Sequence, residues 1–238
     1  MTLPHQFTPI DRATSPSGLQ AVLFDMDGTL VDTEGLWQQA VAREAALLGL
    51  ALGPDDQPFI LGRAAEDTAA HLCERRLATG IRTPVSWLRA ELERRFADLV
   101  RARVVPLPGA LALLDELAAA GVPAALVSAS PRHVVDIVLD ALGRHRFAVT
   151  VAAGETPRTK PAPDPYLAAA GALGVDPAHC VAVEDTPTGI ASAEAAGCAV
   201  LAVPSATPIE PARRRTVVRS LLDADLTLLR TLARAGRA

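Results

Sequence analysis

The stretch AVLFDMDGTLVDTE, residues 21–34, places acidic residues at the end of a strongly apolar run. Residues 21–24 are continuously apolar, which is typical of a strand covered on both faces of a parallel sheet. Asp25 and Asp27 follow this run directly. Nearby carboxylates repel one another, and partial burial adds to the cost of keeping both ionised, so a cation or a chemical role is needed to compensate them. The stretch therefore predicts a buried strand that ends in a functional site.

Further apolar runs of the same kind recur along the chain, and Ala-rich helical runs separate them. Two of these helical runs carry clear boundary signals: Pro108 and Gly121 flank one, while Ser130 is the expected N-cap of another that begins at Pro131 and closes at Gly143. Strands that alternate with helices indicate an α/β fold, here a doubly wound, Rossmann-like parallel sheet. The expected strands lie within residues 19–24, 122–128, 147–153, 180–184 and 199–203.

Residues 33–105 interrupt this alternation, because they contain three helical patterns and no convincing strand. We interpret this stretch as an all-helical cap domain inserted into the sheet domain. The catalytic core is then formed by residues 19–32 and 106–238, and residues 1–18 read as a loose N-terminal tail.

Polar side chains follow several of the expected strands, at the edge where parallel sheets bind their ligands. Side chains alternate along an extended segment, so positions 25 and 27 project to the same side. Their carboxylates and that of Asp185 suit a hard cation such as Mg²⁺, although Asp185 or Thr186 would also serve as the cap of a helix starting at Pro187. The strand-end residues are Asp25, Asp27, Ser128, Lys160, Glu184 and Asp185.

Lys160 is the single lysine among 23 Lys and Arg residues. A lone lysine on a loop is usually solvated. All the other residues of this set are arginines. A compact ammonium kept at this one site indicates that a planar guanidinium would not fit there.

Four segments in order, DMDGT, the strand ending at Ser128, KPAPD with Lys160, and VEDTPTGI, resemble the four motifs of the haloacid dehalogenase (HAD) superfamily of phosphohydrolases. DMDGTLVDTE is similar in particular to the branch that contains sugar-phosphate phosphatases and β-phosphoglucomutase. The resemblance covers residues 19–203 and includes the position of a helical cap.

The resemblance implies a role for each strand-end residue. Asp25 would be the nucleophile that forms an aspartyl-phosphate, and Asp27 would be the general acid and base. Mg²⁺ would be held by the side chains of Asp25 and Asp185 and the backbone carbonyl of Asp27, with Glu184 supporting this shell. Ser128, Ala129 and Lys160 would bind the phosphoryl group.

The substrate expected from these residues is a small phosphorylated metabolite, with a sugar or polyol phosphate favoured. The mutase branch carries a histidine where this chain has Trp37 and a phosphate-binding arginine where it has Ala65, so a phosphosugar mutase is the second choice. A protein that binds a phosphometabolite without turnover is a third. Trp37 and Arg63 are the candidate substrate contacts of the cap.

Composition excludes other classes of function. The net charge of −4 comes with both signs interspersed, which argues against nucleic-acid binding. The sequence contains no apolar run long enough to span a membrane and no signal-peptide pattern, and its three cysteines show no metal-ligand spacing. We expect a cytoplasmic protein that is a monomer or a weak homodimer.

Overall fold

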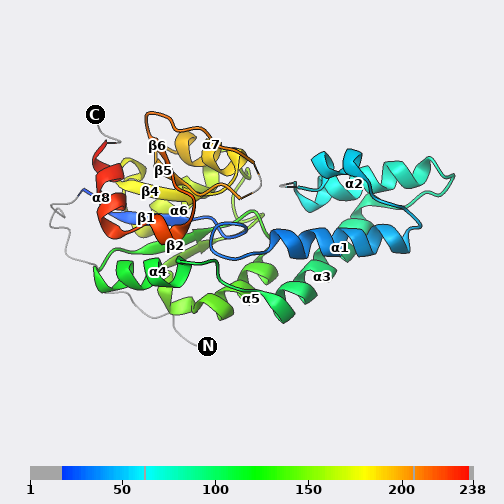
Figure 1. Cartoon of the computed structure of the whole chain (residues 1–238), viewed down its shortest axis with the longest axis horizontal. Coiled ribbons are helices and arrows are strands. Elements are labelled where there is room, and N and C mark those ends of the chain that lie inside the picture. The colour runs from blue at the N-terminus through cyan, green and yellow to red at the C-terminus, as the bar shows by residue number, and fades with distance from the viewer. Residues whose placement is uncertain (1–17, 62, 206, 236–238) are drawn as a thin grey trace.

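The computed structural model describes residues 18–61, 63–205 and 207–235, so most of the expected N-terminal tail lies outside the described residues. Six strands form one sheet in the order β3-β2-β1-β4-β5-β6, and every neighbouring pair is parallel (Figure 1). This confirms the predicted α/β fold with its parallel sheet. The strands are β1 (Ala21–Phe24), β2 (Ala124–Val127), β3 (Val149–Val151), β4 (Cys180–Glu184), β5 (Ala199–Ala202) and β6 (Arg215–Val217).

Alternate residues of β1 enter two different hydrophobic cores, one on each face of the sheet. Val22 and Phe24 pack with residues of α4, α5 and α8, whereas Ala21 and Leu23 pack with residues of α6 and α7. Because helices cover both faces, every position of β1 is buried, which explains its uninterrupted apolar sequence. These helices are α4 (Ala110–Ala119), α5 (Arg132–Leu142), α6 (Asp164–Leu173), α7 (Pro187–Ala195) and α8 (Leu226–Ala235).

The predicted helical insertion is present and extends away from the sheet (Figure 1). It contains α1 (Glu34–Leu47), a 3₁₀ helix (Pro54–Phe59), α2 (Ala65–Leu77) and α3 (Val85–Arg103). Leu88 and Leu92 of α3 belong to the insertion's own core. Phe96 and Val100 of the same helix belong to the core that the sheet forms with α4, α5 and α8. One continuous helix therefore ties the insertion to the sheet domain. The bounds of the cap domain, residues 33 and 105, stay a proposal.

The C-terminal region completes the sheet with a strand that the sequence pattern does not predict. β6 is short, and Arg215 at its start pairs with Glu194 of α7, with nitrogen and oxygen 2.7 Å apart. A three-residue edge strand that opens with a charged residue lacks the apolar run that marks the other strands. The remaining 3₁₀ helices are Arg144–Arg146, Pro177–His179 and Leu221–Asp223.

The start of α5 differs from the prediction. The helix begins at Arg132 with Pro131 as its N-cap residue, and no side chain among the described residues caps it. The hydroxyl of Ser130 donates instead to the carboxylate of Asp27. The assignment of Ser130 as a helix cap is therefore wrong, because a tertiary partner takes its hydroxyl.

No helix within residues 18–61, 63–205 and 207–235 is both long and apolar enough to cross a membrane.

Candidate active site

The carboxyl end of β1 carries Asp25 into a buried position between β2 and β4. The backbone N–H of Asp25 donates to the carbonyl of Val183, at 2.9 Å, so the ladder with β4 extends to this residue. Gly28 then turns the chain with a φ of +77°, a conformation that other residues adopt only with strain. A Cβ atom at Gly28 would lie 2.3 Å from Oδ2 of Asp185. Glycine is therefore required both by the turn and by the close approach of Asp185.

Lys160 is buried and its ammonium group has three acceptors at the ends of three strands. Nζ lies 2.6 Å from Oδ1 of Asp25, 2.7 Å from Oε1 of Glu184 and 2.9 Å from the carbonyl oxygen of Val127. Burial alone would lower its pKa, but the two carboxylates outweigh burial and raise it. Lys160 therefore stays charged, and it is buried, unlike the solvated lysines usual on loops.

Asp25, Glu184 and Asp185 form a buried acidic cluster in which one oxygen of each lies within 4.8 Å of the others. Burial, followed by the nearby charge of Asp25, raises the pKa of Asp185 to about 8. Burial also raises the pKa of Glu184 to about 7, against the opposing effect of Lys160. These raised pKa values show that the cluster, when fully ionised, is short of positive charge, because one ammonium does not neutralise three carboxylates.

The donor set of this cluster fits a hard divalent cation. Oδ1 of Asp185 and Oε2 of Glu184 are buried and have no hydrogen-bond partner among the described residues. Buried carboxylate oxygens without a partner are costly, and a cation that prefers oxygen ligands would compensate them. Thr186, and not Asp185, caps α7, since its hydroxyl accepts from the N–H of Gly189 at 3.1 Å. The carboxylate of Asp185 is therefore not used as a helix cap.

Three hydroxyl groups surround the carboxylate of Asp27. Thr33 donates to Oδ1 at 2.7 Å, while Ser130 and Ser128 donate to Oδ2 at 2.8 and 3.3 Å. Desolvation and the neighbouring charge of Asp25 raise the pKa of Asp27, and these hydrogen bonds limit the rise. Asp27 therefore has a fixed orientation and a proton affinity above that of a solvated aspartate.

The loop after β2 supplies the serine pair. Ser128 is buried and continues the ladder to β3, donating its N–H to Val151 at 2.9 Å. Its hydroxyl also accepts from the N–H of Ser130 at 2.9 Å, which fixes the turn between the two serines. Ala129 lies in this turn and is exposed. Both residues predicted from the sequence are therefore at the same sheet edge as Asp25, and Ser130 joins them.

Tyr166 and Ser205 reach the cluster although the sequence motifs predict a role for neither. The hydroxyl of Tyr166 donates to Oε1 of Glu184, and its ring centre lies 5.2 Å from Nζ of Lys160. Ser205 donates to Oδ2 of Asp185 at 2.6 Å. Tyr166 is the single tyrosine of the chain and follows KPAPDP closely, which is a signal that could have singled it out. Ser205 has no comparable signal.

Within the part of the chain that the structure describes, the two cap candidates form their hydrogen bonds away from this cluster. Trp37 donates its indole N–H to the carbonyl of Ile60 at 3.0 Å and packs edge-on against Phe96. Arg63 is exposed, and its Nε donates to the carbonyl of Pro58 at 3.0 Å. These contacts are internal to the helical insertion and its junction with the core. Substrate contact by Trp37 or Arg63 stays a prediction.

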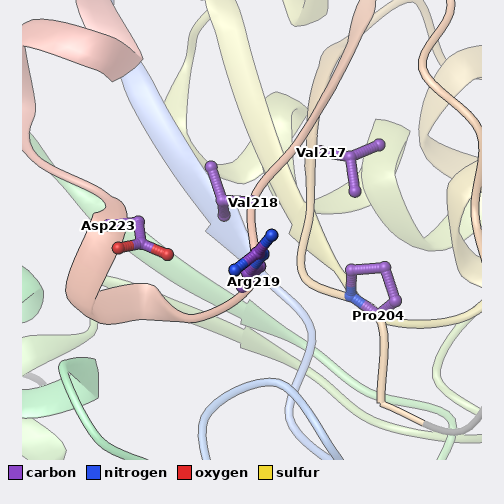
Figure 2. Close-up of a pocket in the computed structure, with 5 residues that line it drawn as sticks. All are labelled: Pro204, Val217, Val218, Arg219 and Asp223. Carbon is purple, nitrogen blue, oxygen red and sulfur yellow. The ribbon is translucent and has the colours of Figure 1, made fainter.

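A groove of about 750 Å³ lies beside the site, next to the segments that follow β5 and β6. Figure 2 shows Arg219 among the residues that line this groove, together with Pro204 and Asp223. Asp25 and Lys160 do not line it. The catalytic candidates instead form a compact cluster whose polar atoms contact one another.

Comparison with known proteins identifies relatives of this chain. The profile of the haloacid dehalogenase-like hydrolases matches residues 19–197. Hexitol phosphatase A of Escherichia coli (strain K12) is 38% identical over 195 residues, covering 78% of this chain and 84% of that protein. The CbbY protein of Rhodobacter capsulatus is 34% identical over 197 residues, covering 79% and 86%.

Solved structures show the same architecture. A HAD family hydrolase from Deinococcus radiodurans R1, solved with bound phosphate and sodium, superposes with a TM-score of 0.66 and is 31% identical, covering 92% of this chain and 97% of that one. CbbY from Rhodobacter sphaeroides, in complex with phosphate, gives a TM-score of 0.76 at 24% identity, covering 89% and 99%, and supports the fold alone. With its profile match over residues 19–197, its parallel sheet and its strand-end carboxylates, the chain belongs to the haloacid dehalogenase-like hydrolase family.

Proposed function

We propose that the protein is a Mg²⁺-dependent phosphatase that hydrolyses a small phosphorylated metabolite, a sugar or polyol phosphate, through an aspartyl-phosphate on Asp25. The observation that carries the proposal is the buried cluster of Asp25, Lys160, Glu184 and Asp185, with Asp27 held beside it by three hydroxyls. The substrate class is supported by the similarity to hexitol phosphatases and CbbY proteins.

In the first step, a carboxylate oxygen of Asp25 bonds to phosphorus while the ester P–O bond breaks. The leaving alkoxide takes a proton from Asp27, whose raised pKa favours the protonated form. Lys160 holds Asp25 in place and supplies positive charge where the phosphoryl oxygens gather.

In the second step, water attacks the aspartyl-phosphate and gives its proton to Asp27. The P–O bond to Asp25 breaks, and inorganic phosphate leaves with Asp25 regenerated. The hydroxyls of Thr33 and Ser130 keep the Asp27 carboxyl oriented through both proton transfers.

Asp25, Asp185 and the backbone carbonyl of Asp27 are the residues that would hold Mg²⁺, with Glu184 behind them. When bound, the cation would offset the negative charge of the carboxylates and the phosphate, which otherwise repel one another.

A phosphate-release screen over sugar, hexitol and aryl monophosphates tests the proposal. We expect release with Mg²⁺, little release in excess chelator, and none above background for Asp25→Asn. Asp32→Asn is the matched control, because Asp32 is exposed in the same loop. Full turnover in chelator would contradict the metal assignment.

Product analysis separates the alternatives: an isomerised sugar phosphate indicates a mutase, and calorimetric binding without release indicates a binding protein.

A further inference from the structure

The loop after β5 brings Ser205 onto the acidic cluster. Its hydroxyl donates to Oδ2 of Asp185 at 2.6 Å. The residue itself is exposed, so the hydroxyl reaches inward from the surface. With a cation bound, Asp185 is ionised, and a hydrogen bond to a charged acceptor is stronger than one between neutral groups.

The sheet register fixes where this loop starts. Ala202 pairs with Glu184, and the N–H of Val203 donates to the carbonyl of Glu184 at 2.8 Å. The segment carrying Ser205 is therefore anchored to the residue that directly precedes Asp185. From the other side, a Cβ at Gly28 would lie 2.3 Å from Oδ2 of Asp185 and 3.3 Å from the hydroxyl oxygen of Ser205. Oδ2 is thus enclosed between the loop of Gly28 and the hydroxyl of Ser205.

The second oxygen of Asp185 is in a different situation. Oδ1 is buried and has no hydrogen-bond partner among the described residues. An oxygen of the Asp185 carboxylate lies within 4.8 Å of a carboxylate oxygen of Asp25 and of Glu184. One oxygen of Asp185 is therefore committed to the protein and the other is available to a ligand. Such a carboxylate binds a cation through one oxygen. Mg²⁺ requires a compact octahedral shell, whereas Ca²⁺ readily takes both oxygens of a carboxylate in a larger shell.

We propose that Ser205 is a positioning residue that makes Asp185 a one-oxygen ligand and thereby favours Mg²⁺ over Ca²⁺ at this site. The inference rests on the metal site of the proposed function and adds the residue that sets its cation preference. Hydrogen bonds to metal-binding carboxylates typically change metal affinity by about 10–100-fold.

The surroundings of Ser205 influence how much Mg²⁺ affinity is lost when its hydroxyl is removed. A hollow of about 140 Å³ adjoins it, lined by Gly28, Thr29, Leu107 and Arg219 among others, and shares Pro204 and Arg219 with the groove of Figure 2. A water in this space would replace part of the lost hydrogen bond when the hydroxyl is removed. The expected loss of Mg²⁺ affinity is therefore about tenfold, at the lower end of the range of about 10–100-fold.

The test is calorimetric titration of the whole protein with Mg²⁺ and, separately, with Ca²⁺ at one pH. Ser205→Ala should weaken Mg²⁺ binding about tenfold and Ca²⁺ binding less, so that the preference for Mg²⁺ narrows. Ser205→Thr keeps the hydroxyl and should restore the wild-type preference. Ser220→Ala is the matched control, because Ser220 lines the same hollow while its hydroxyl accepts from the N–H of Leu222.

Melting curves in chelator check that each variant is folded, and they should coincide. Equal Mg²⁺ to Ca²⁺ ratios in the wild type and Ser205→Ala would overturn the inference, as would equal losses in Ser205→Ala and Ser205→Thr. A wild-type protein that binds neither cation would overturn the metal site together with this inference. A wild-type protein that binds Mg²⁺ but releases no phosphate would overturn the phosphatase proposal alone, since the titrations still decide the role of Ser205.

Discussion

Nζ of Lys160 lies 2.6 Å from Oδ1 of Asp25, although 135 positions separate the two residues in the chain. Each stands beyond a different strand, and the parallel sheet brings the two together. The ammonium also contacts Glu184 and Val127, so its three hydrogens have three acceptors around a buried centre. A compact point charge satisfies this arrangement.

Lys160→Arg should lower kcat/KM by about 10²–10³-fold although the charge is kept, a loss comparable to removal of one transition-state donor. The guanidinium is larger and planar, and it has no room between Asp25, Glu184 and the ring of Tyr166. Steady-state kinetics on a variant with wild-type circular dichroism would measure this. Arg158→Lys in the same loop, where an exposed side chain pairs with Asp164, should keep full activity. Equal activity of both variants would contradict the role given to Lys160.

Asp27→Asn should separate the two steps of the mechanism. The amide keeps the size and the backbone carbonyl but transfers no proton, so hydrolysis of a sugar phosphate should fall by about 10²–10⁴-fold. An acyl phosphate has a leaving group that needs no proton, so it should still phosphorylate Asp25. The adduct should then accumulate, and mass spectrometry of the quenched protein would locate it. Wild-type turnover of a sugar phosphate by this variant would show that Asp27 is not the acid and base.

Ser130→Ala should move the pH–rate profile to higher pH. The hydrogen bond from Ser130 lowers the pKa of Asp27, against the larger rise caused by desolvation and Asp25. Its removal therefore raises that pKa further, and the limb of the profile that belongs to Asp27 shifts to higher pH whether this residue acts as acid or base in the limiting step. Ser130→Thr keeps the hydroxyl and should leave the profile in place. An unmoved profile in Ser130→Ala would assign Ser130 to structure only.

Arg63→Ala should change the ranking of substrates more than the rate on a small aryl phosphate. A small ester can react without touching the helical insertion, whereas a larger metabolite uses remote contacts to favour closure over the site. The comparison is kcat/KM across the substrate panel. Arg82→Ala, another exposed arginine of the insertion, serves as the control. A uniform loss on all substrates would indicate that Arg63 only supports the fold.

Asp56→Asn should destabilise the helical insertion. Asp56 is buried and accepts hydrogen bonds at 2.7 Å from His71, Arg75 and the N–H of Gly53. The melting midpoint should fall by several degrees, since 1 kcal/mol corresponds to about 2–4 °C in a chain of this size. Asp55→Asn, at the exposed neighbouring position, should melt like the wild type.

The same variant has a predictable pH dependence. Burial alone would raise the pKa of Asp56, but the hydrogen bonds from Gly53, His71 and Arg75 outweigh it and hold the pKa below its ordinary value. Its stabilising contribution is therefore present above the pKa of the unfolded chain and is lost as the pH falls through the folded pKa. The gap between wild type and Asp56→Asn should close in strong acid. A gap that persists there would show that packing, and not charge, is the cause.

The strands of the sheet interior and the residues at their ends are predictable from the sequence alone. A strand covered on both faces needs a continuous apolar run, and a parallel sheet gathers its strand ends at one edge, so the order of residues is enough to group Asp25, Ser128, Glu184 and Asp185. The helical insertion is equally visible, because its apolar residues recur with the period of a helix.

The partners of these residues are decided by the tertiary structure. Ser130 has the sequence context of a helix cap, and only the packing of β2 beside β1 sends its hydroxyl to Asp27. Ser205 and Tyr166 each act on a carboxylate from a different segment of the chain, so no local pattern predicts their contacts. β6 has no apolar run of its own, and it forms a strand by pairing in parallel with β5. Local patterns report burial and secondary structure, whereas a hydrogen bond between distant segments depends on how the whole chain packs.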